Sequence, residues 1–162
     1  MAHTSIWVPG TIVEAEHPDQ LAPLIRKGWG TFFEQEGGFS WFHIPIAAPF
    51  ALDGQNLVLT TVFVFYKATN GLIVRNIHVF SGSRRVQAFD CLHFAGEQTE
   101  MKDSNLNMLD LSPHVFITAG LGISVGVDFK DGGEILFPVP AATFNRLSNF
   151  TSQFSRSELG VA

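Results

Sequence analysis

Cysteine is nearly absent from this sequence. Cys91 is the only cysteine in 162 residues, so no intramolecular disulfide can form. We expect it to be a buried structural thiol. It is not expected to form a catalytic pair with His93, because strand neighbours two residues apart seldom bring their tips together.

Positive charge is also scarce. The chain has 10 Lys and Arg against 15 Asp and Glu, a formal net charge of −5, and contains no basic run. A negative net charge opposes binding to a phosphate backbone. We therefore expect no nucleic-acid partner.

Long hydrophobic runs are missing as well. The apolar stretches have the length of strands and are interrupted, which argues against a membrane span and a membrane partner. The start, Met-Ala-His-Thr, lacks the basic region and apolar run of a signal peptide. The predicted location is the cytoplasm, with leaderless export as the alternative.

The composition that remains is that of a well-packed domain. Hydrophobic residues make up 46% and charged residues 15% of the chain, and its 16 Phe are spread along most of its length. A chain of this size can bury a substantial core. We predict one β-sandwich domain over residues 1–144 and a tail or short helix over residues 145–162.

Residues 57–80 form the most informative stretch. Two arms rich in Val, Ile, Phe and Thr flank Asn70 and Gly71, a pattern that predicts a β-hairpin. The first arm is apolar on both faces. A strand of that kind is covered on both faces, so this hairpin is expected at the centre of the fold.

One short helix is predicted over residues 18–28. Pro18 suits the first helical position, and Gly28 can end the helix. Pro23 limits its length to about two turns. An apolar stripe would face the protein and cover one end of the sheets: Leu21, Leu24 and Ile25.

Residues 120–129 alternate strictly. Odd positions are large and apolar, and even positions are Gly, Ser or Asp. A bare strand face marks something large lying close against it, or a surface that a partner covers. We therefore predict an interface, and a homo-oligomer, at these positions: Gly120, Gly122, Ser124 and Gly126.

The whole pattern of about eight or nine short strands predicts an all-β fold, an antiparallel β-sandwich or jelly roll. Five segments resemble a family of small bacterial single-domain β proteins of unknown function: SIWVPG, GWGT, WFHIP, RNIHVF and GISVGVDF. The resemblance covers roughly residues 4–144. It implies no activity, cofactor or catalytic residue.

A metal site is one candidate for function. His43, His78 and His93 each fall on a predicted strand and would suit zinc or iron if they converged inside a barrel. The His-x-His pair of cupins is absent, however, and three separate hydrogen-bonded histidines are the simpler interpretation. Calcium is a second metal candidate, in two acidic turns: Asp128, Asp131 and Glu134, and Glu97, Glu100 and Asp103. Solvated turns are the alternative there.

Nucleophilic catalysis has little support. Ser124 stands in a Gly-x-Ser-x-Gly sequence, but that sequence lies within a strand pattern and no helix follows it, as the nucleophile elbow requires.

Carbohydrate is the better ligand class, because β-sandwiches bind sugars with exposed aromatics beside polar loops. The candidate residues are Trp7, Trp29, Trp41, Asp53 and Asn56. Tryptophans in a small domain also serve as core or interface residues. We therefore predict a non-catalytic binding or self-assembly module, with no required cofactor. The alternatives are a carbohydrate-binding domain and a small metal-dependent barrel enzyme.

Overall fold

The fold is built almost entirely from antiparallel β-strands. The computed structural model describes residues 3–48, 51–52, 55–69, 71–100, 107–138 and 141–146. Fifteen strands and two short 3-10 helices, η1 (Gly10–Ile12) and η2 (Pro18–Gln20), lie in those ranges. In the same ranges, no helix has the length and apolar character needed to cross a membrane.

The strands form three sheets of five strands, here called A, B and C. Sheet A runs β1 (His3–Trp7), β15 (Ala141–Arg146), β7 (Gln55–Phe63) and β12 (Met108–Phe116), with β6 (Ala51–Leu52) paired to β7. Sheet B runs β10 (Arg84–Phe89), β9 (Ile73–Ser81), β13 (Leu121–Lys130), β5 (Gly38–Ile46) and β2 (Glu14–Ala15). Sheet C runs β11 (Glu97–Gln98), β8 (Tyr66–Ala68), β14 (Gly133–Phe137), β4 (Gly30–Gln35) and β3 (Ile25–Lys27).

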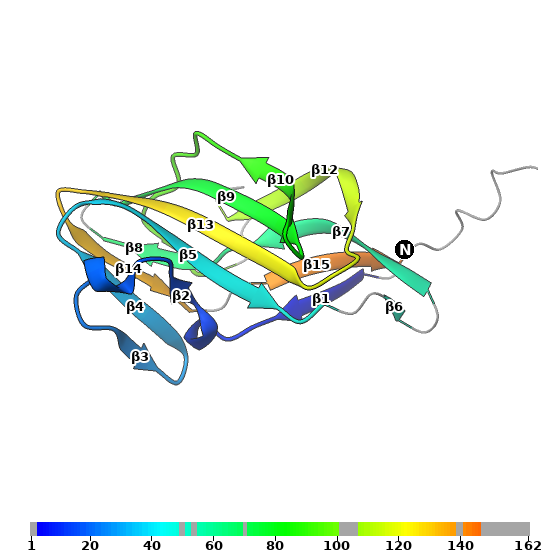
Figure 1. Cartoon of the computed structure of the whole chain (residues 1–162), viewed down its shortest axis with the longest axis horizontal. Coiled ribbons are helices and arrows are strands. Elements are labelled where there is room, and N and C mark those ends of the chain that lie inside the picture. The colour runs from blue at the N-terminus through cyan, green and yellow to red at the C-terminus, as the bar shows by residue number, and fades with distance from the viewer. Residues whose placement is uncertain are drawn as a thin grey trace, which may run out of the picture.

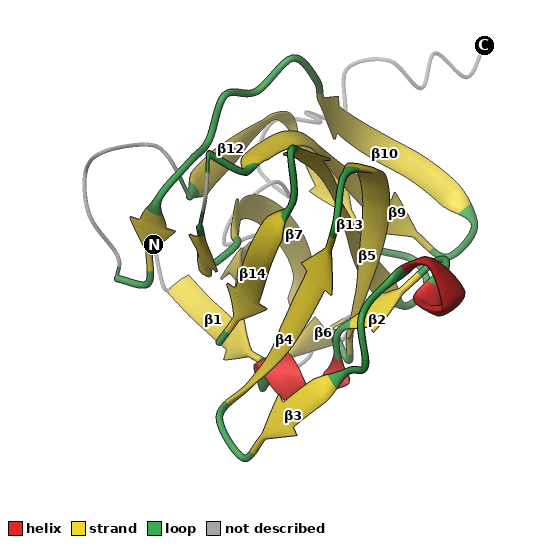
Figure 2. Cartoon of the chain, turned by 90° about the vertical axis from the view of Figure 1, so that its left-hand side faces the viewer, coloured by secondary structure: helices red, strands yellow, loops and turns green. Residues whose placement is uncertain are grey.

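The sheets are arranged as a sandwich. Sheets C and A lie end to end, and the long strands β5 and β13 of sheet B extend along both (Figure 1). Seen from the side, β4 and β14 face β5 and β13 across the interior (Figure 2). The predicted antiparallel β class is confirmed.

The core between the layers is rich in phenyl rings. Phe42 of β5 has its ring centroid 4.6 Å from that of Phe33 on β4 and 5.4 Å from that of Phe137 on β14. Phe129 of β13 lies 6.2 Å from Phe42. These contacts join sheets B and C through one aromatic cluster, as the many spread Phe residues indicate.

The predicted hairpin over residues 57–80 is wrong. Its first arm, β7, belongs to sheet A, the short β8 belongs to sheet C, and β9 belongs to sheet B. The chain therefore visits all three sheets, because β7 ends at Phe63 and a new strand begins at Tyr66 in another sheet. Asn70 lies outside the described residues.

The expected burial of β7 on both faces is nevertheless present. Leu59 and Val62 face the core with no exposed surface, and Phe63, on a second hydrophobic cluster, is also buried. Trp7 of β1 covers that second cluster, with its ring centroid 6.3 Å from Phe63 and 5.6 Å from Phe65. The second face of β7 is thus covered by an aromatic side chain from β1.

The predicted helix over residues 18–28 is also wrong. Only Pro18–Gln20 coils, as η2, and the chain then straightens into strand β3. Pro23 has no N–H for a helical bond, and the Ala22 N–H instead donates to the Glu34 carbonyl at 2.9 Å. Leu24 and Ile25, expected on a buried stripe, are 45% and 53% exposed.

The alternation in residues 120–129 holds. The odd-numbered side chains of β13 are all buried in the core, and β13 lies between β5 and β9 in the middle of sheet B. Its even-numbered positions therefore form the centre of the other face of sheet B.

Candidate functional site

The face of sheet B that points away from the core is the candidate site, and we call it the outer face. Residues directly opposite in an antiparallel pair share a face, so the register defines its members. On β13 they are Gly122, Ser124, Gly126 and Asp128; their partners are Pro45, His43, Trp41 and Phe39 on β5, and Phe80, His78 and Asn76 on β9.

Aromatic rings cover the middle of the outer face. Trp41 and Phe39 meet edge to face, with centroids 5.4 Å apart, and Trp41 lies 4.9 Å from the His78 ring. The His78 ring is in turn 6.5 Å from Phe80. Both Trp41 and Phe80 are half-buried, and Phe39 is 43% exposed. The result is a continuous aromatic row across β5 and β9.

The bare face of β13 allows this row to form. A Cβ placed on Gly126 would come within 2.6 Å of Phe39 Cζ and 3.1 Å of Trp41 Cη2. The prediction that something large lies against the bare strand is confirmed at this glycine, where the large groups come from the same chain.

Polar groups stand on either side of the row. Ser124 Oγ lies 2.9 Å from His43 Nδ1, and His43 Nε2 lies 3.5 Å from Glu16 Oε2. The Glu16 carboxylate favours a proton on Nε2, which leaves Nδ1 to accept from the Ser124 hydroxyl. His43 is thereby held in one orientation beside the aromatic row.

His78 is held by a second carboxylate. Its Nε2–H donates to Asp90 Oδ1 at 2.8 Å, and Asn76 Nδ2 donates to the same oxygen at 2.5 Å. The hydrogen bond from His78, with a second from Asn76, lowers the pKa of Asp90 below its usual range, against the opposing effect of burial. Asp90 therefore stays ionised and fixes the imidazole ring.

A shallow groove of about 560 Å³ lies beside these groups. Three of the four predicted interface residues, Gly120, Gly122 and Ser124, border it, together with His43 and Phe80. Gly126 lies instead under Trp41. The glycines leave backbone exposed, so the groove can admit a flat ligand.

The Glu16–His43–Ser124 chain has the composition of a catalytic triad but not its setting. Ser124 is 8% exposed and lies within β13, with pairing to β5 and β9 on both sides. The backbone around it is therefore used in the sheet and is not turned to form an oxyanion hole. The arrangement holds the His43 ring in place between Ser124 and Glu16.

The structure does not bring the three candidate histidines together. His43 and His78 lie on opposite sides of Ser124 in the register, two strand spacings or roughly 10 Å apart. His93 lies in another cluster. Within the described ranges, no three His, Cys, Asp or Glu side chains are grouped as metal ligands.

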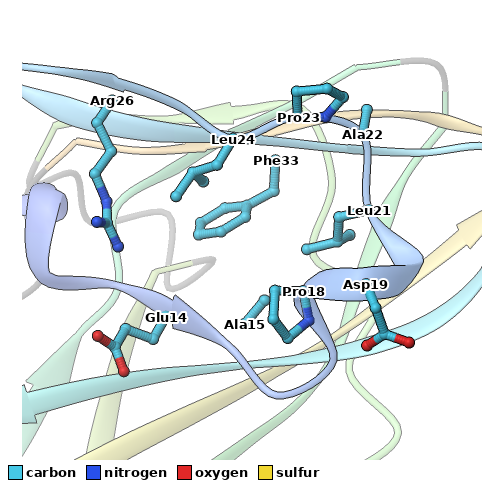
Figure 3. A pocket seen from close by; sticks show the side chains of 10 residues that line it. All are labelled: Glu14, Ala15, Pro18, Asp19, Leu21, Ala22, Pro23, Leu24, Arg26 and Phe33. Atoms are coloured by element: carbon cyan, nitrogen blue, oxygen red, sulfur yellow. The ribbon is translucent and has the colours of Figure 1, made fainter.

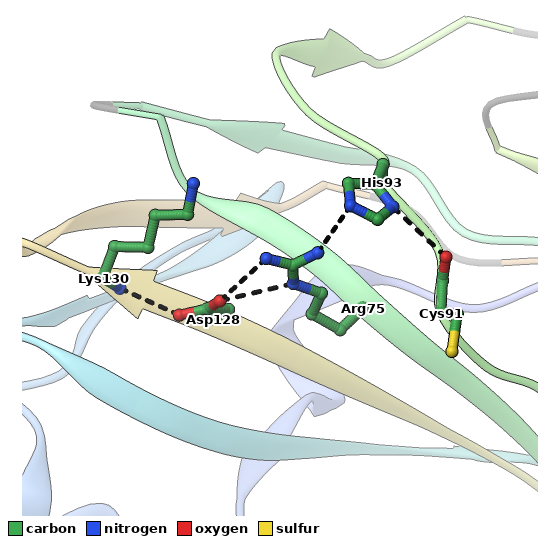
Figure 4. A network of polar contacts seen from close by, with 5 residues as sticks. All are labelled: Arg75, Cys91, His93, Asp128 and Lys130. Atoms are coloured by element: carbon green, nitrogen blue, oxygen red, sulfur yellow. Dashed lines mark hydrogen bonds and ion pairs between the residues drawn. The ribbon is translucent and has the colours of Figure 1, made fainter.

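His93 belongs to a network centred on Arg75, which Figure 4 shows. Arg75 Nη1 donates to His93 Nε2 at 2.8 Å, and its Nε and Nη2 donate to Asp128 Oδ2 at 3.3 and 3.2 Å. Because Nε2 of His93 accepts, its Nδ1 carries the proton and donates to the Cys91 carbonyl at 3.2 Å. This network ties β9 and β13 to the chain after β10.

The same network corrects two expectations. Cys91, predicted to be buried, is exposed, and it adopts a positive φ of 57°. Asp128, a candidate calcium ligand, is instead paired with Arg75 and accepts from the Lys130 N–H. Of the other calcium candidates, Glu97 pairs with Lys67, and Asp103 lies outside the described residues.

The predicted carbohydrate residues are dispersed. Trp7 is on β1 of sheet A, Trp29 lies between β3 and β4 of sheet C, and only Trp41 is on the outer face of sheet B. Asn56 is part of β7, and Asp53 lies outside the described residues. Composition alone selected the one tryptophan that lies on this face; its neighbours His78 and Phe80 follow only once the strand pairing is known.

A second concavity lies between sheets B and C (Figure 3). Residues 16–24, here called the covering segment, cross from β2 to β3, and hydrogen bonds tie it to Trp41 O on β5 and Glu34 O on β4. Beneath it is a cavity of about 430 Å³. Its lining is mostly apolar and includes Leu21, Leu24 and Phe33.

Together these features define an antiparallel β protein with an open aromatic sheet face. The chain belongs to DUF6623, a family of unknown function, whose family model matches residues 1–137. This confirms the predicted membership of a family without an assigned activity. No curated protein matches the chain.

Two solved structures are similar to it. TmCBM61 in complex with β-1,4-galactotriose shares 13% identity over 86% of each chain, with a TM-score of 0.38. The Stig cyclase Fisc from Fischerella sp. TAU, in complex with (3Z)-3-(1-methyl-2-pyrrolidinylidene)-3H-indole, shares 12% identity over 91% of this chain and 100% of the other, with a TM-score of 0.45. Both TM-scores lie below 0.5.

Proposed function

We propose that this protein is a non-catalytic binding module that binds carbohydrate on the outer face of sheet B. The observation that supports it is the aromatic row of Trp41, His78 and Phe80, held over a bare strand and flanked by fixed polar groups. An aromatic platform of this kind, left half-buried and not packed in the core, is suited to a ligand with flat apolar faces.

Carbohydrate fits both parts of this surface. A pyranose ring presents C–H groups on its faces, which pack on aromatic rings, and hydroxyl groups at its edge. Around the row, His43, Ser124, Asn76 and Asp90 provide donors and acceptors, and Asp90 is a charged acceptor that strengthens such bonds. The groove of about 560 Å³ lies in the size range of small-ligand sites.

The test is a glycan array followed by titration calorimetry with the best-binding oligosaccharide. Trp41→Ala is expected to reduce affinity by about five- to thirtyfold, since removing a stacking aromatic costs on the order of 1–2 kcal/mol. Trp29→Ala is the matched control, because Trp29 is exposed on a different sheet. Equal affinity for both variants, or no glycan bound by the native protein, would rule out this function.

Self-association is a separate proposal with its own support. Large apolar side chains are exposed at several places, including Phe39 on the outer face and Trp29 and Ile25 on sheet C. Such residues are common at subunit interfaces. Native mass spectrometry of the whole chain tests this directly; a monomer at all accessible concentrations would reject the homo-oligomer.

A further inference from the structure

The cavity under the covering segment has an apolar middle and charged residues at both ends. Phe33 and Leu24 lie at its centre and Leu21 and Pro18 close one side, with Asp19 beside them, while Arg26 and Glu14 project at the opposite end (Figure 3). Phe33 is 3% exposed and belongs to the main core, so the cavity floor is part of the packed core.

Arg26 stands on the inner side of sheet C. It lies opposite Thr31 in the register of β3 and β4, and Thr31 is fully buried. Leu24 precedes Arg26 by two residues and Phe33 follows Thr31 by two, so the alternation of strands brings these side chains to the same side. A guanidinium is thus placed at the edge of an apolar pocket.

In the described part of the chain, Arg26 has no carboxylate within ion-pair distance, and Glu14 has no cationic side chain within that distance. Both line the cavity, one from β3 and the other from β2. A ligand carboxylate on Arg26 alone would be repelled by Glu14, and a ligand ammonium on Glu14 alone would be repelled by Arg26. A head group that carries both charges meets both side chains favourably.

We propose that this cavity binds a small zwitterion with an apolar body, of the class of free aliphatic α-amino acids. The carboxylate lies against the Arg26 guanidinium, which suits it in two-pronged geometry. The ammonium faces Glu14, and the aliphatic body packs on Leu21, Leu24 and Phe33. Glu14 lies opposite His43 at the edge of sheet B and borders both this cavity and the groove of the outer face. Occupancy of the cavity nevertheless does not require the proposed carbohydrate function.

Three related probes separate the charges. L-leucine carries both, 4-methylpentanoate has the same body and carboxylate without the ammonium, and 3-methylbutylamine lacks the carboxylate. In a titration followed by amide chemical shifts of the labelled full chain, leucine is expected to bind saturably and to shift residues of the covering segment and β3. Both single-charge probes are expected to bind at least about tenfold more weakly, since each loses one charge-assisted contact.

Variants assign the contacts. Arg26→Gln is expected to reduce the affinity for leucine by about tenfold or more. Glu14→Gln should weaken the binding of leucine and at the same time strengthen the binding of 4-methylpentanoate. Loss of the fold cannot produce these opposite changes in affinity. Arg84→Gln is the matched control, because Arg84 is also an exposed arginine on an edge strand, β10, away from the cavity. It should bind leucine as the native protein does.

The contrary results are equally specific. The proposal is overturned if leucine does not bind saturably, if 4-methylpentanoate binds the native protein as tightly as leucine, or if Arg84→Gln matches Arg26→Gln. It is also overturned if Arg26→Gln only promotes self-association and leaves leucine binding unchanged. In that case the inward-pointing charge of Arg26 serves to prevent the exposed edge of β3 from pairing with another chain. Leucine binding that persists in Trp41→Ala separates this site from the carbohydrate face.

Discussion

The indole of Trp41 occupies the space that a side chain at Gly126 would fill. A Cβ at position 126 would lie 3.1 Å from both Cη2 and Cζ3 of the indole. The glycine is therefore required for the close approach of the ring to β13, and the ring's position on the outer face depends on it.

Gly126→Ala is expected to displace Trp41 and Phe39 while the protein stays folded. The atoms in the way are the ends of two side chains at the surface, so they can move outward. Replacing a strand glycine also recovers roughly 0.5–1 kcal/mol of backbone entropy, which offsets part of the strain. The indole N–H resonance of Trp41 should shift, and affinity for the array-selected glycan should fall.

Gly122→Ala is the control for that change. A Cβ at position 122 would meet only Phe80 Cβ at 3.8 Å, an ordinary contact. This variant should keep the Trp41 resonance in place. If both alanine variants leave the resonance and the affinity unchanged, the ring does not depend on a bare strand.

The hydrogen bond from His78 to Asp90 gives a second prediction. Asp90→Asn should loosen the His78 ring and reduce glycan affinity several-fold, because the charged acceptor that fixes the imidazole is lost. Nitrogen chemical shifts of the His78 ring report the change of tautomer directly. A ring that keeps its single tautomer in the variant would show that the aromatic neighbours alone hold it.

The same pair predicts the direction of a pH dependence. Because the pKa of Asp90 is lowered in the folded protein, its stabilising effect is present above the unfolded value of about 3.9 and is lost as the pH falls through the folded value. In Asp90→Asn this part of the acid sensitivity should disappear. Acid titrations of the free energy of unfolding for the two proteins test it.

Local pattern predicted the sheet class and the inner face of β13, because strict alternation depends only on which face is buried. It failed for residues 57–80, since two adjacent β-prone arms look the same whether they pair with each other or with distant strands. Here β7 pairs with β15 and β12, and β9 pairs with β13 and β10. The partner of each strand is decided by the whole fold, so it cannot be predicted from a short stretch of sequence.

The candidate site shows the same limit. Trp41, His43, His78 and the glycines of β13 could be singled out by residue type, but their grouping around Ser124 requires the register of three strands. The Arg75 network was not predicted at all, because Arg75, His93 and Asp128 are separated by 18 and 53 residues in the chain. The predicted helix failed because hydrogen bonding of Ala22 to β4 prevailed over the apolar spacing.

Removing the carboxylate at position 128 should destabilise the protein measurably. Arg75 and Asp128 are only 28% and 29% exposed, and two guanidinium nitrogens contact one oxygen. Asp128→Asn is expected to lower the free energy of unfolding by about 1 kcal/mol, measured by urea denaturation. Lys67→Gln breaks a more exposed pair, with side chains 49% and 55% exposed, and should cost less than about 0.5 kcal/mol. If the two variants lose equal amounts of unfolding free energy, partial burial does not strengthen the pair of Arg75 and Asp128.

Tyr66 offers a spectroscopic test of the core. It is the chain's only tyrosine and is fully buried, and burial raises the pKa of its hydroxyl well above the ordinary value. The neutral form is thus favoured in the folded protein, so its stabilising effect is complete below the unfolded pKa of about 10 and decreases as the pH rises above it. In an alkaline titration, tyrosinate absorbance should appear only together with loss of the β-sheet circular dichroism signal. Tyrosinate formation at about pH 10 in a protein that remains folded would contradict the burial of Tyr66 between sheets.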